Sequence, residues 1–278
     1  MNVYVFENVF ILPKNCPTFL NKFTYKCFYS LLFHLLKMRR KVVLENLKIA
    51  FPHKNQDWYH NISSKCYKFY TKDFLEFLSF PRYFNHDEIK FKNIEILDDA
   101  LEHNKGVLFV GGHFGAFDKL FYSLANRGYS LCGVAYKQKD GVADMFFKTI
   151  RERYMKKQLY KGGSSKELKG ALNNNEILVL LSDQDARDKG KKVNFFDIPS
   201  STPSGAAILH KRMGSPIVFF TITKINNEHF VEFKKINASN ALSVDQIVQE
   251  YTSALEAAIR KRPEQYFWFH KRWKTTFQ

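Results

Sequence analysis

One stretch of the chain, Val107 to Asp118, joins a short apolar run, a pair of glycines and a helical pattern in the sequence VLFVGGHFGAFD. The run Val107–Val110 is rich in β-branched and aromatic side chains, which predicts a buried strand. From Phe114 onward, apolar residues recur about one turn apart, which predicts a helix. A strand that passes through a glycine turn into a helix is typical of α/β sheets. The junction places His113 where such sheets bind their ligands.

His113 and Asp118 are five positions apart, and this spacing allows two interpretations. If His113 precedes the first helical turn, its side chain can fold back toward Asp118. The carboxylate would then hold Nδ1–H, and Nε2 could remove a proton from a hydroxyl group. In the other interpretation His113 caps the helix and Asp118 is solvated. The spacing alone does not separate the two.

Five blocks of sequence, in order along the chain, carry a resemblance to a known family. The block HFGAFD has the HxxxxD form of the glycerolipid and lysophospholipid acyltransferase superfamily. Four further blocks are similar to those of its bacterial lipid A (lauroyl/myristoyl) acyltransferase branch: RRKVVLENLKIAFPHK, LLSDQDARD, FFDIPSSTPSGAA and PEQYFWFHKRW. Together they cover the chain from about residue 39 to its end.

The resemblance implies a membrane-associated O-acyltransferase. The fatty acyl chain would move from acyl-acyl carrier protein to a hydroxyl of a lipid A precursor or a related glycolipid. His113 would be the general base, and Asp118 would orient it. The family needs no metal and no cofactor for the transfer. A lysophospholipid or a lipoamino acid is the alternative acceptor.

A polar segment with Asp183, Asp185 and Arg187 comes just after the apolar run Ile177–Leu181, which reads as a strand. Ligands of open α/β sheets bind at the carboxyl ends of strands. In the resembling family this block lies near the catalytic pocket, so we expect the three residues to bind substrate. The alternative is a surface turn with local hydrogen bonds.

Three more residues are candidates for substrate binding. Arg151 and Arg153 lie on the second helix after the central motif, and a guanidinium there could clamp a phosphate. For either arginine alone, a solvated or ion-paired helix face is the competing interpretation. Thr202 precedes a predicted helix start, a place suited to anions.

The charge of the chain points to a partner that carries phosphates or carboxylates. There are 43 Lys and Arg against 27 Asp and Glu, which gives a formal charge of +16. An anionic membrane, an acidic carrier protein and nucleic acid all fit this balance. A biased base composition of the genome would also raise the lysine content. The four cysteines form no CxxC pair, which favours a reducing compartment.

The residues from Pro17 to Met38 are predicted to form an amphipathic helix with an aromatic apolar face and basic flanks. Such a helix can lie in a membrane interface, or it can pack on the rest of the protein. We expect residues 1–41 to be a membrane-associating extension and residues 42–278 to be the acyltransferase domain. The expected location is the cytoplasmic face of the cell inner membrane.

The remaining chain alternates predicted strands and helices, and Ile225-Asn226-Asn227 reads as a hairpin turn. These patterns predict an α/β fold with a mixed, largely parallel sheet flanked by helices. By resemblance, the fold is glycerolipid-acyltransferase-like.

Two other classes of protein are alternatives to the acyltransferase. A nucleic-acid-binding protein would explain the charge, but no helix-turn-helix, RNP-like or zinc-finger pattern is present, so nucleic acid is not expected as a partner. A serine hydrolase would also use a His and an Asp. The chain has no GxSxG elbow, and its histidine precedes its aspartate, which is the wrong order for the α/β-hydrolase fold.

Overall fold

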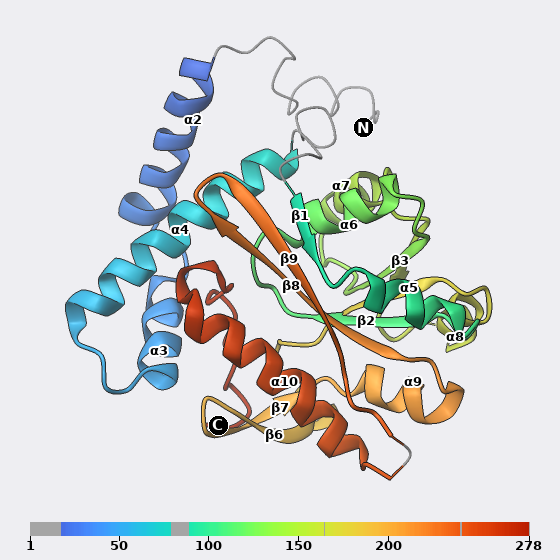
Figure 1. Ribbon diagram of the computed structural model, residues 1–278. Helices are drawn as coiled ribbons and strands as arrows, with labels where there is room; N and C mark the ends of the chain where they lie inside the picture. Colours follow the sequence, from blue (N-terminus) through green and yellow to red (C-terminus); the bar gives the residue numbers. More distant parts are fainter. Residues whose placement is uncertain (1–17, 79–88, 164, 240, 278) are drawn as a thin grey trace. The chain divides into compact units, whose positions relative to one another are not determined.

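The computed structural model of the protein describes residues 18–78, 89–163, 165–239 and 241–277 (Figure 1). The chain divides into two compact units. One contains residues 1–86 and 263–270, and the other contains residues 87–262 and 271–278. The boundary expected between residues 41 and 42 stays a prediction.

The first unit is helical. Its elements are α2 (Thr18–Ser30), the π-helical turn η1 (Leu31–Leu35), α3 (Arg40–Ala50), α4 (Gln56–Leu78) and the short 3-10 helix η4 (Pro263–Gln265). The helix predicted over residues 17–38 is therefore present in shorter form. Its α-helical part ends at Ser30, a wider turn follows, and Pro17 lies outside the described residues.

The apolar side chains of the segment α2–η1 fall into two groups: some are buried in the first unit, and others are exposed. Phe33 is buried and packs edge-on against Tyr67 of α4, with ring centroids 5.0 Å apart. By contrast, Phe23, Leu35 and Leu36 are 60%, 74% and 62% exposed. Both interpretations of this segment thus have a structural basis: one side packs, and another side presents apolar surface.

The early and the terminal sequence blocks meet within this unit. The amide of Asn46, buried on α3, donates hydrogen bonds to the carbonyl oxygens of Trp268, at 2.7 Å, and His270, at 2.6 Å. Arg39 donates to the carbonyl of Phe269 at 2.9 Å. A buried backbone carbonyl that lacks a hydrogen-bond partner destabilises the folded state. These bonds therefore hold the terminal segment against α3.

The second unit is built on one sheet with the strand order β1-β9-β8-β2-β5-β3-β4. Every neighbouring pair is parallel except the hairpin of β8 and β9. The strands are β1 (Ile89–Lys92), β2 (Val107–Gly111), β3 (Leu131–Ala135), β4 (Lys157–Tyr160), β5 (Ile177–Leu181), β8 (Ile217–Ile225) and β9 (Glu228–Lys235). The predicted fold class, a mixed and largely parallel sheet, is confirmed.

Helices flank this sheet (Figure 1). They are α5 (Glu95–Glu102), α6 (Phe117–Asn126), α7 (Gly141–Arg151), α8 (Ser165–Asn173), α9 (Gly205–Met213) and α10 (Val244–Lys261). On one side of the sheet, Phe109 of β2 stacks on Phe220 of β8 with ring centroids 4.3 Å apart, and Phe121 of α6 packs on both rings. This aromatic cluster seats α6 against the strand that leads into the central motif.

Several element boundaries differ from the predictions. Helix α6 begins at Phe117 rather than Phe114, and α7 ends at Arg151, so Arg153 lies beyond the helix on which it was predicted. The two-stranded antiparallel sheet of β6 (Lys191–Phe195) and β7 (Ile198–Thr202) was not predicted. This hairpin carries little period-2 alternation, and it is held by non-local packing: the ring of Phe195 stacks on Trp273 at 5.6 Å.

Candidate active site

The central histidine lies where two parallel strands end side by side. β2 and β5 are paired along their full length, and the N–H of Ser182 continues the ladder by donating to the carbonyl of Gly111 at 2.8 Å. His113 is the second residue after β2, and Asp183 is the second residue after β5. The register of the two strands therefore brings these side chains to the same point at the edge of the sheet.

His113 is held by the carboxylate of Asp183 through two hydrogen bonds. Its ring nitrogen Nδ1 lies 2.7 Å from Oδ1, and its backbone N–H donates to Oδ2 at 3.0 Å. The Asp183 side chain is 2% exposed, whereas that of His113 is 26% exposed. An ionised Asp183 is only an acceptor, so it fixes the proton of a neutral imidazole on Nδ1 and leaves Nε2 as the basic nitrogen.

The pKa values of this pair are displaced in opposite directions. Burial lowers the pKa of His113, but the charge of Asp183 and its hydrogen bond outweigh this, so the pKa lies above its ordinary value of 6.5. Burial raises the pKa of Asp183, but the charge and hydrogen bonds of His113 outweigh it, and that pKa is lowered. Asp183 is therefore ionised at neutral pH.

The turn that carries His113 lies close to its neighbours because it is rich in glycine. Gly115 has a φ of +66°, and a Cβ there would come within 1.7 Å of the carbonyl oxygen of Ile222 on β8. A Cβ on Gly112 would come within 2.6 Å of the Leu255 side chain on α10. At Gly115 only glycine permits this path of the backbone, and the close contacts of both glycines place the turn against β8 and α10.

Asp118 does not occupy the expected place at His113 Nδ1. It lies in the first turn of α6, where its Oδ1 accepts a hydrogen bond from the hydroxyl of Tyr154 at 2.7 Å. Helix α6 begins only at Phe117 and Nδ1 faces the end of β5, so Asp183 bonds Nδ1 in this structure, and the catalytic role of Asp118 stays a prediction. Burial raises the pKa of Asp118, while the charges of Arg151 and His113 act in the opposite direction.

The two candidate arginines are placed differently. Arg151, the last residue of α7, lines the pocket at His113, and its guanidinium donates to Oε1 of Gln158 at 3.2 Å. Its charge also lowers the pKa of both His113 and Asp118. Arg153 is exposed and is not among the residues that line this pocket. Of the pair, only Arg151 is brought to His113.

The pocket at His113 has a volume of about 400 Å³ and a mixed lining. Cationic and polar side chains lie beside apolar ones from α6, α9 and the strand ends. Its members include His113, Asp118, Arg151, Gln158, Lys161 and Gln184, together with Phe117, Phe121, Val134, Met155, Leu181 and Leu209. An anionic group and an alkyl chain could both be accommodated by such a lining. The sequence analysis missed Gln158, Lys161 and the Asp118 partner Tyr154, because no motif marks them.

The other predicted substrate-binding residues lie outside this lining. Asp185 accepts hydrogen bonds from the backbone N–H of Thr275 at 2.8 Å and from its hydroxyl at 2.6 Å. The buried hydroxyl of Thr202 accepts one from Arg272 at 2.5 Å. The carbonyl of Arg187 accepts one from the Ser201 hydroxyl. The contacts of Asp185 and Thr202 hold the end of the chain at Thr275 and Arg272, and substrate binding by these residues stays a prediction.

Two negative observations concern the described residues. Among them, no group of three or more His, Cys, Asp or Glu side chains is arranged to hold a metal ion. A search of the same residues finds no helix with both the length and the apolar character needed to cross a bilayer.

Comparison with known proteins gives a consistent result. The family described as bacterial lipid A biosynthesis acyltransferase matches residues 4–275. The lipid A biosynthesis palmitoleoyltransferase of Escherichia coli (strain K12) is 22% identical over 253 residues, which cover 86% of this chain and 80% of that protein. The lipid A biosynthesis acyltransferase of Shigella flexneri matches with the same identity and coverage.

Proposed function

The chain belongs to the bacterial lipid A biosynthesis acyltransferase family, and we propose that it moves a fatty acyl chain from acyl-acyl carrier protein to a hydroxyl of a lipid A precursor. That it is an acyltransferase follows from the family. The donor, the acceptor hydroxyl and the mechanism are our proposal. The observation that carries it is the His113–Asp183 pair at the edge of a partly apolar pocket that also contains Arg151.

In the proposed reaction, Nε2 of His113 takes the proton of the acceptor hydroxyl as its oxygen attacks the thioester carbonyl. The new C–O bond forms, the C–S bond breaks, and the sulfur leaves as a thiol with the proton from the imidazolium. The carboxylate of Asp183 holds Nδ1–H throughout and stabilises the positive charge of the imidazolium. No acyl-enzyme is needed.

The proposal is tested by incubating the purified protein with acyl-acyl carrier protein and a lipid A precursor. Mass spectrometry should show one additional acyl group on the precursor. Lipid extracts of a deletion strain should contain lipid A that lacks one acyl chain. An acyl chain missing instead from a phospholipid or a lipoamino acid would contradict the proposed acceptor.

For Arg151 we predict a specific effect on the acceptor. If its guanidinium binds an acceptor phosphate, Arg151→Ala should raise the acceptor KM by at least tenfold and leave the donor KM nearly unchanged. Arg153→Ala is the matched control, because this arginine is exposed outside the pocket lining. Equal changes in both KM values, or the same effect from Arg153→Ala, would contradict the assignment.

Attachment to the inner membrane is also part of the proposal. The exposed apolar residues of α2–η1 are accompanied by Lys22, Lys26, Lys37 and Lys41, which suits an anionic lipid interface. We propose that this segment lies on the cytoplasmic face of the membrane with Phe23, Leu35 and Leu36 inserted.

We predict that the protein co-sediments with anionic vesicles and that salt weakens the binding, since the Debye length falls to roughly 3 Å at 1 M. Replacing Phe23, Leu35 and Leu36 together by Ser should remove most of the binding without changing the melting profile. The control is Phe277→Ser, because Phe277 is 63% exposed elsewhere on the chain. Undiminished sedimentation of the triple variant would rule out this segment as the anchor.

A further inference from the structure

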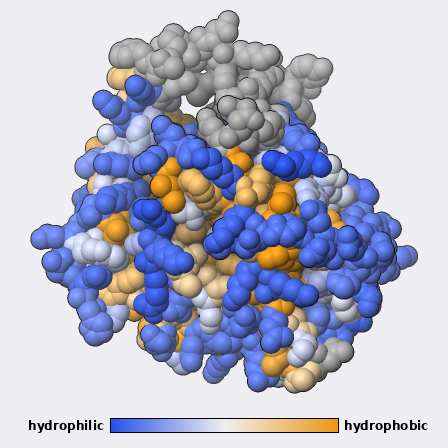
Figure 2. Space-filling model, in the orientation of Figure 1, coloured by the Kyte–Doolittle hydropathy of each residue, from blue (hydrophilic) through white to orange (hydrophobic). Residues whose placement is uncertain are grey.

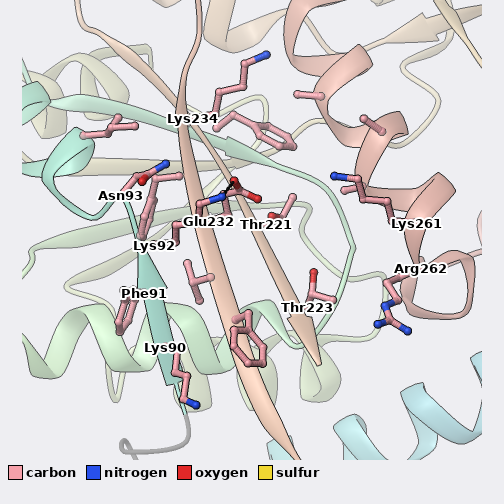
Figure 3. Close-up of a pocket in the computed structure, with 18 of the residues that line it drawn as sticks. Lys90, Phe91, Lys92, Asn93, Thr221, Thr223, Glu232, Lys234, Lys261 and Arg262 are labelled. Atoms are coloured by element: carbon pink, nitrogen blue, oxygen red, sulfur yellow. Dashed lines mark hydrogen bonds and ion pairs between the residues drawn. The ribbon is translucent and has the colours of Figure 1, made fainter. Parts of the chain in front are cut away.

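One face of β1, β9 and β8 is hollowed into a groove of about 900 Å³ (Figure 3). Because side chains alternate along a strand, the residues that face it come from every second position. These are Lys90 and Lys92 of β1, Thr221 and Thr223 of β8, and Phe230, Glu232 and Lys234 of β9. The floor of the groove is therefore a sheet surface, and it lies entirely within the second unit.

Helix α10 forms one wall of the groove. Its lining positions include Ala254, Ala257 and Ala258, whose side chains are the smallest after glycine. Helices that pack side by side on a sheet are about 8–10 Å apart, and small side chains at the contact allow the closer distances. The small side chains of this wall leave space beside α10, and the floor of that space is the pleated surface of three strands.

The groove is cationic on both sides. Six basic residues line it, namely Lys90, Lys92, Lys234, Lys235, Lys261 and Arg262, against the single carboxylate of Glu232. Figure 3 shows Lys261 and Arg262 on the α10 side and Lys90 and Lys92 on the opposite side. In the orientation of Figure 1, the exposed surface is mostly hydrophilic, with smaller apolar patches between the hydrophilic residues (Figure 2).

Half of these cations are already in ion pairs, and half are not. Lys90 pairs with Glu228 at 2.6 Å, Lys92 with Glu232 at 2.8 Å, and Lys234 with Glu250 at 3.3 Å. These pairs are exposed, and such pairs contribute little, so the lysines can change partners easily. Lys235, Lys261 and Arg262 form no ion pair with any residue in the described part of the chain.

The groove borders the turn that carries His113. Ala254 and Ala258 of the wall flank Leu255, whose side chain lies against Gly112. On the floor, Thr221 and Thr223 flank Ile222, whose carbonyl oxygen lies against Gly115. A molecule in the groove would be separated from the catalytic turn by one layer of residues.

We propose that this groove docks an acidic helix of the carrier protein that delivers the acyl chain. This inference rests on the proposed function, because it assigns the groove as the binding surface for the acyl-carrier donor. A helix has a diameter of about 10–12 Å and can enter a concave groove with cations on both sides. A lipid surface is too flat to reach both sides, and the lining offers a nucleic acid no row of exposed aromatic rings for base stacking.

The test is a charge-reversal variant in which the two unpaired cations on the α10 side of the groove are replaced: Lys261→Glu and Arg262→Glu. The control variant, Lys211→Glu with Arg212→Glu, changes the same residue types at the end of α9, outside the lining of the groove. Binding of the acyl-free carrier protein is measured by fluorescence anisotropy at low and high salt. Transfer kinetics are measured with the acyl-carrier donor.

Electrostatic steering typically changes association rates by 10–10³-fold. We therefore expect the groove variant to bind the carrier at least tenfold more weakly and to have a donor KM at least tenfold higher. Its kcat, its vesicle binding and its melting profile should be near normal, and the control should match the wild type. If reversal unfolds the protein, Lys261→Gln with Arg262→Gln should reproduce the trend.

Equal carrier binding by the groove variant and the control would overturn the inference. So would a groove variant that loses binding to anionic vesicles or to RNA while it keeps carrier binding. Failure of the proposed function looks different, because the wild type would then bind the carrier without transferring its acyl chain to a lipid A precursor.

Discussion

Replacing His113 by Ala should lower the rate of acyl transfer by about 10²–10⁴-fold while the protein stays folded, since a positioned general base typically contributes that much. His113 follows β2 directly, and its ring is bonded to the ionised Asp183, so the variant removes the basic nitrogen without removing any part of the sheet. Steady-state transfer from the carrier protein to a lipid A precursor measures the loss.

The matched control is His103→Ala, because His103 is an exposed histidine at the end of α5. It should have normal activity, and all variants should melt at the wild-type temperature. A His113→Ala protein with near-normal transfer and a normal melting profile would contradict the proposed mechanism. The family membership would stand, because it does not depend on this residue alone.

The pH dependence of the wild-type rate follows from the same pair. Only neutral imidazole can accept a proton, so kcat/KM should rise with pH through the pKa of His113. Asp183 holds that pKa above the ordinary value of 6.5, so the rise should be centred above 6.5. A profile that falls over this range would indicate that protonated His113 is the active form.

The scaffold of the site could be predicted from sequence because its signals are local. The apolar runs that form β2 and β5 were predicted as strands, and the structure confirms Val107–Val110, which β2 extends by Gly111, and Ile177–Leu181. The hairpin turn predicted at Ile225-Asn226-Asn227 is also confirmed, because it joins the antiparallel pair β8 and β9. Each of these features depends on residues within a few positions of one another.

The partner of His113 could not be predicted in this way. Asp183 is 70 positions from His113, and the two meet only because β2 and β5 are neighbours in the sheet. Strand order arises from non-local pairing that no sequence window contains. Asp118 was predicted as the partner of His113 because it belongs to the same motif. Helix α6 begins only at Phe117, and the Asp118 carboxylate accepts a hydrogen bond from Tyr154. The bonds of Asn46 to the terminal block were hidden for the same reason.

Replacing Asp183 and Asp118 by Asn, one at a time, should show which of the two carboxylates acts through His113. In Asp183→Asn, the amide can offer only one oxygen where two donors of His113 now bond, so one N–H faces a donor. The imidazole loses its fixed tautomer, and transfer should fall by about 10²–10⁴-fold, a loss of the size seen in other histidine–carboxylate pairs. Combining it with His113→Ala should be little worse than His113→Ala alone, because residues that act as one unit are not additive.

Asp118→Asn is the matched comparison, because its amide oxygen can still accept the hydroxyl of Tyr154. Asp118→Asn should lose less activity than Asp183→Asn. Its effect should not show the same non-additivity with His113→Ala. Both variants remove a negative charge that raises the pKa of His113, so the rise of kcat/KM should move to lower pH in each, and further in Asp183→Asn, whose charge has the larger effect. If Asp118→Asn instead gives the larger loss and the non-additive double variant, then the carboxylate of the HxxxxD motif orients the base in the substrate complex, as its spacing first suggested. Asp183 would then serve to hold the turn through the backbone N–H of His113.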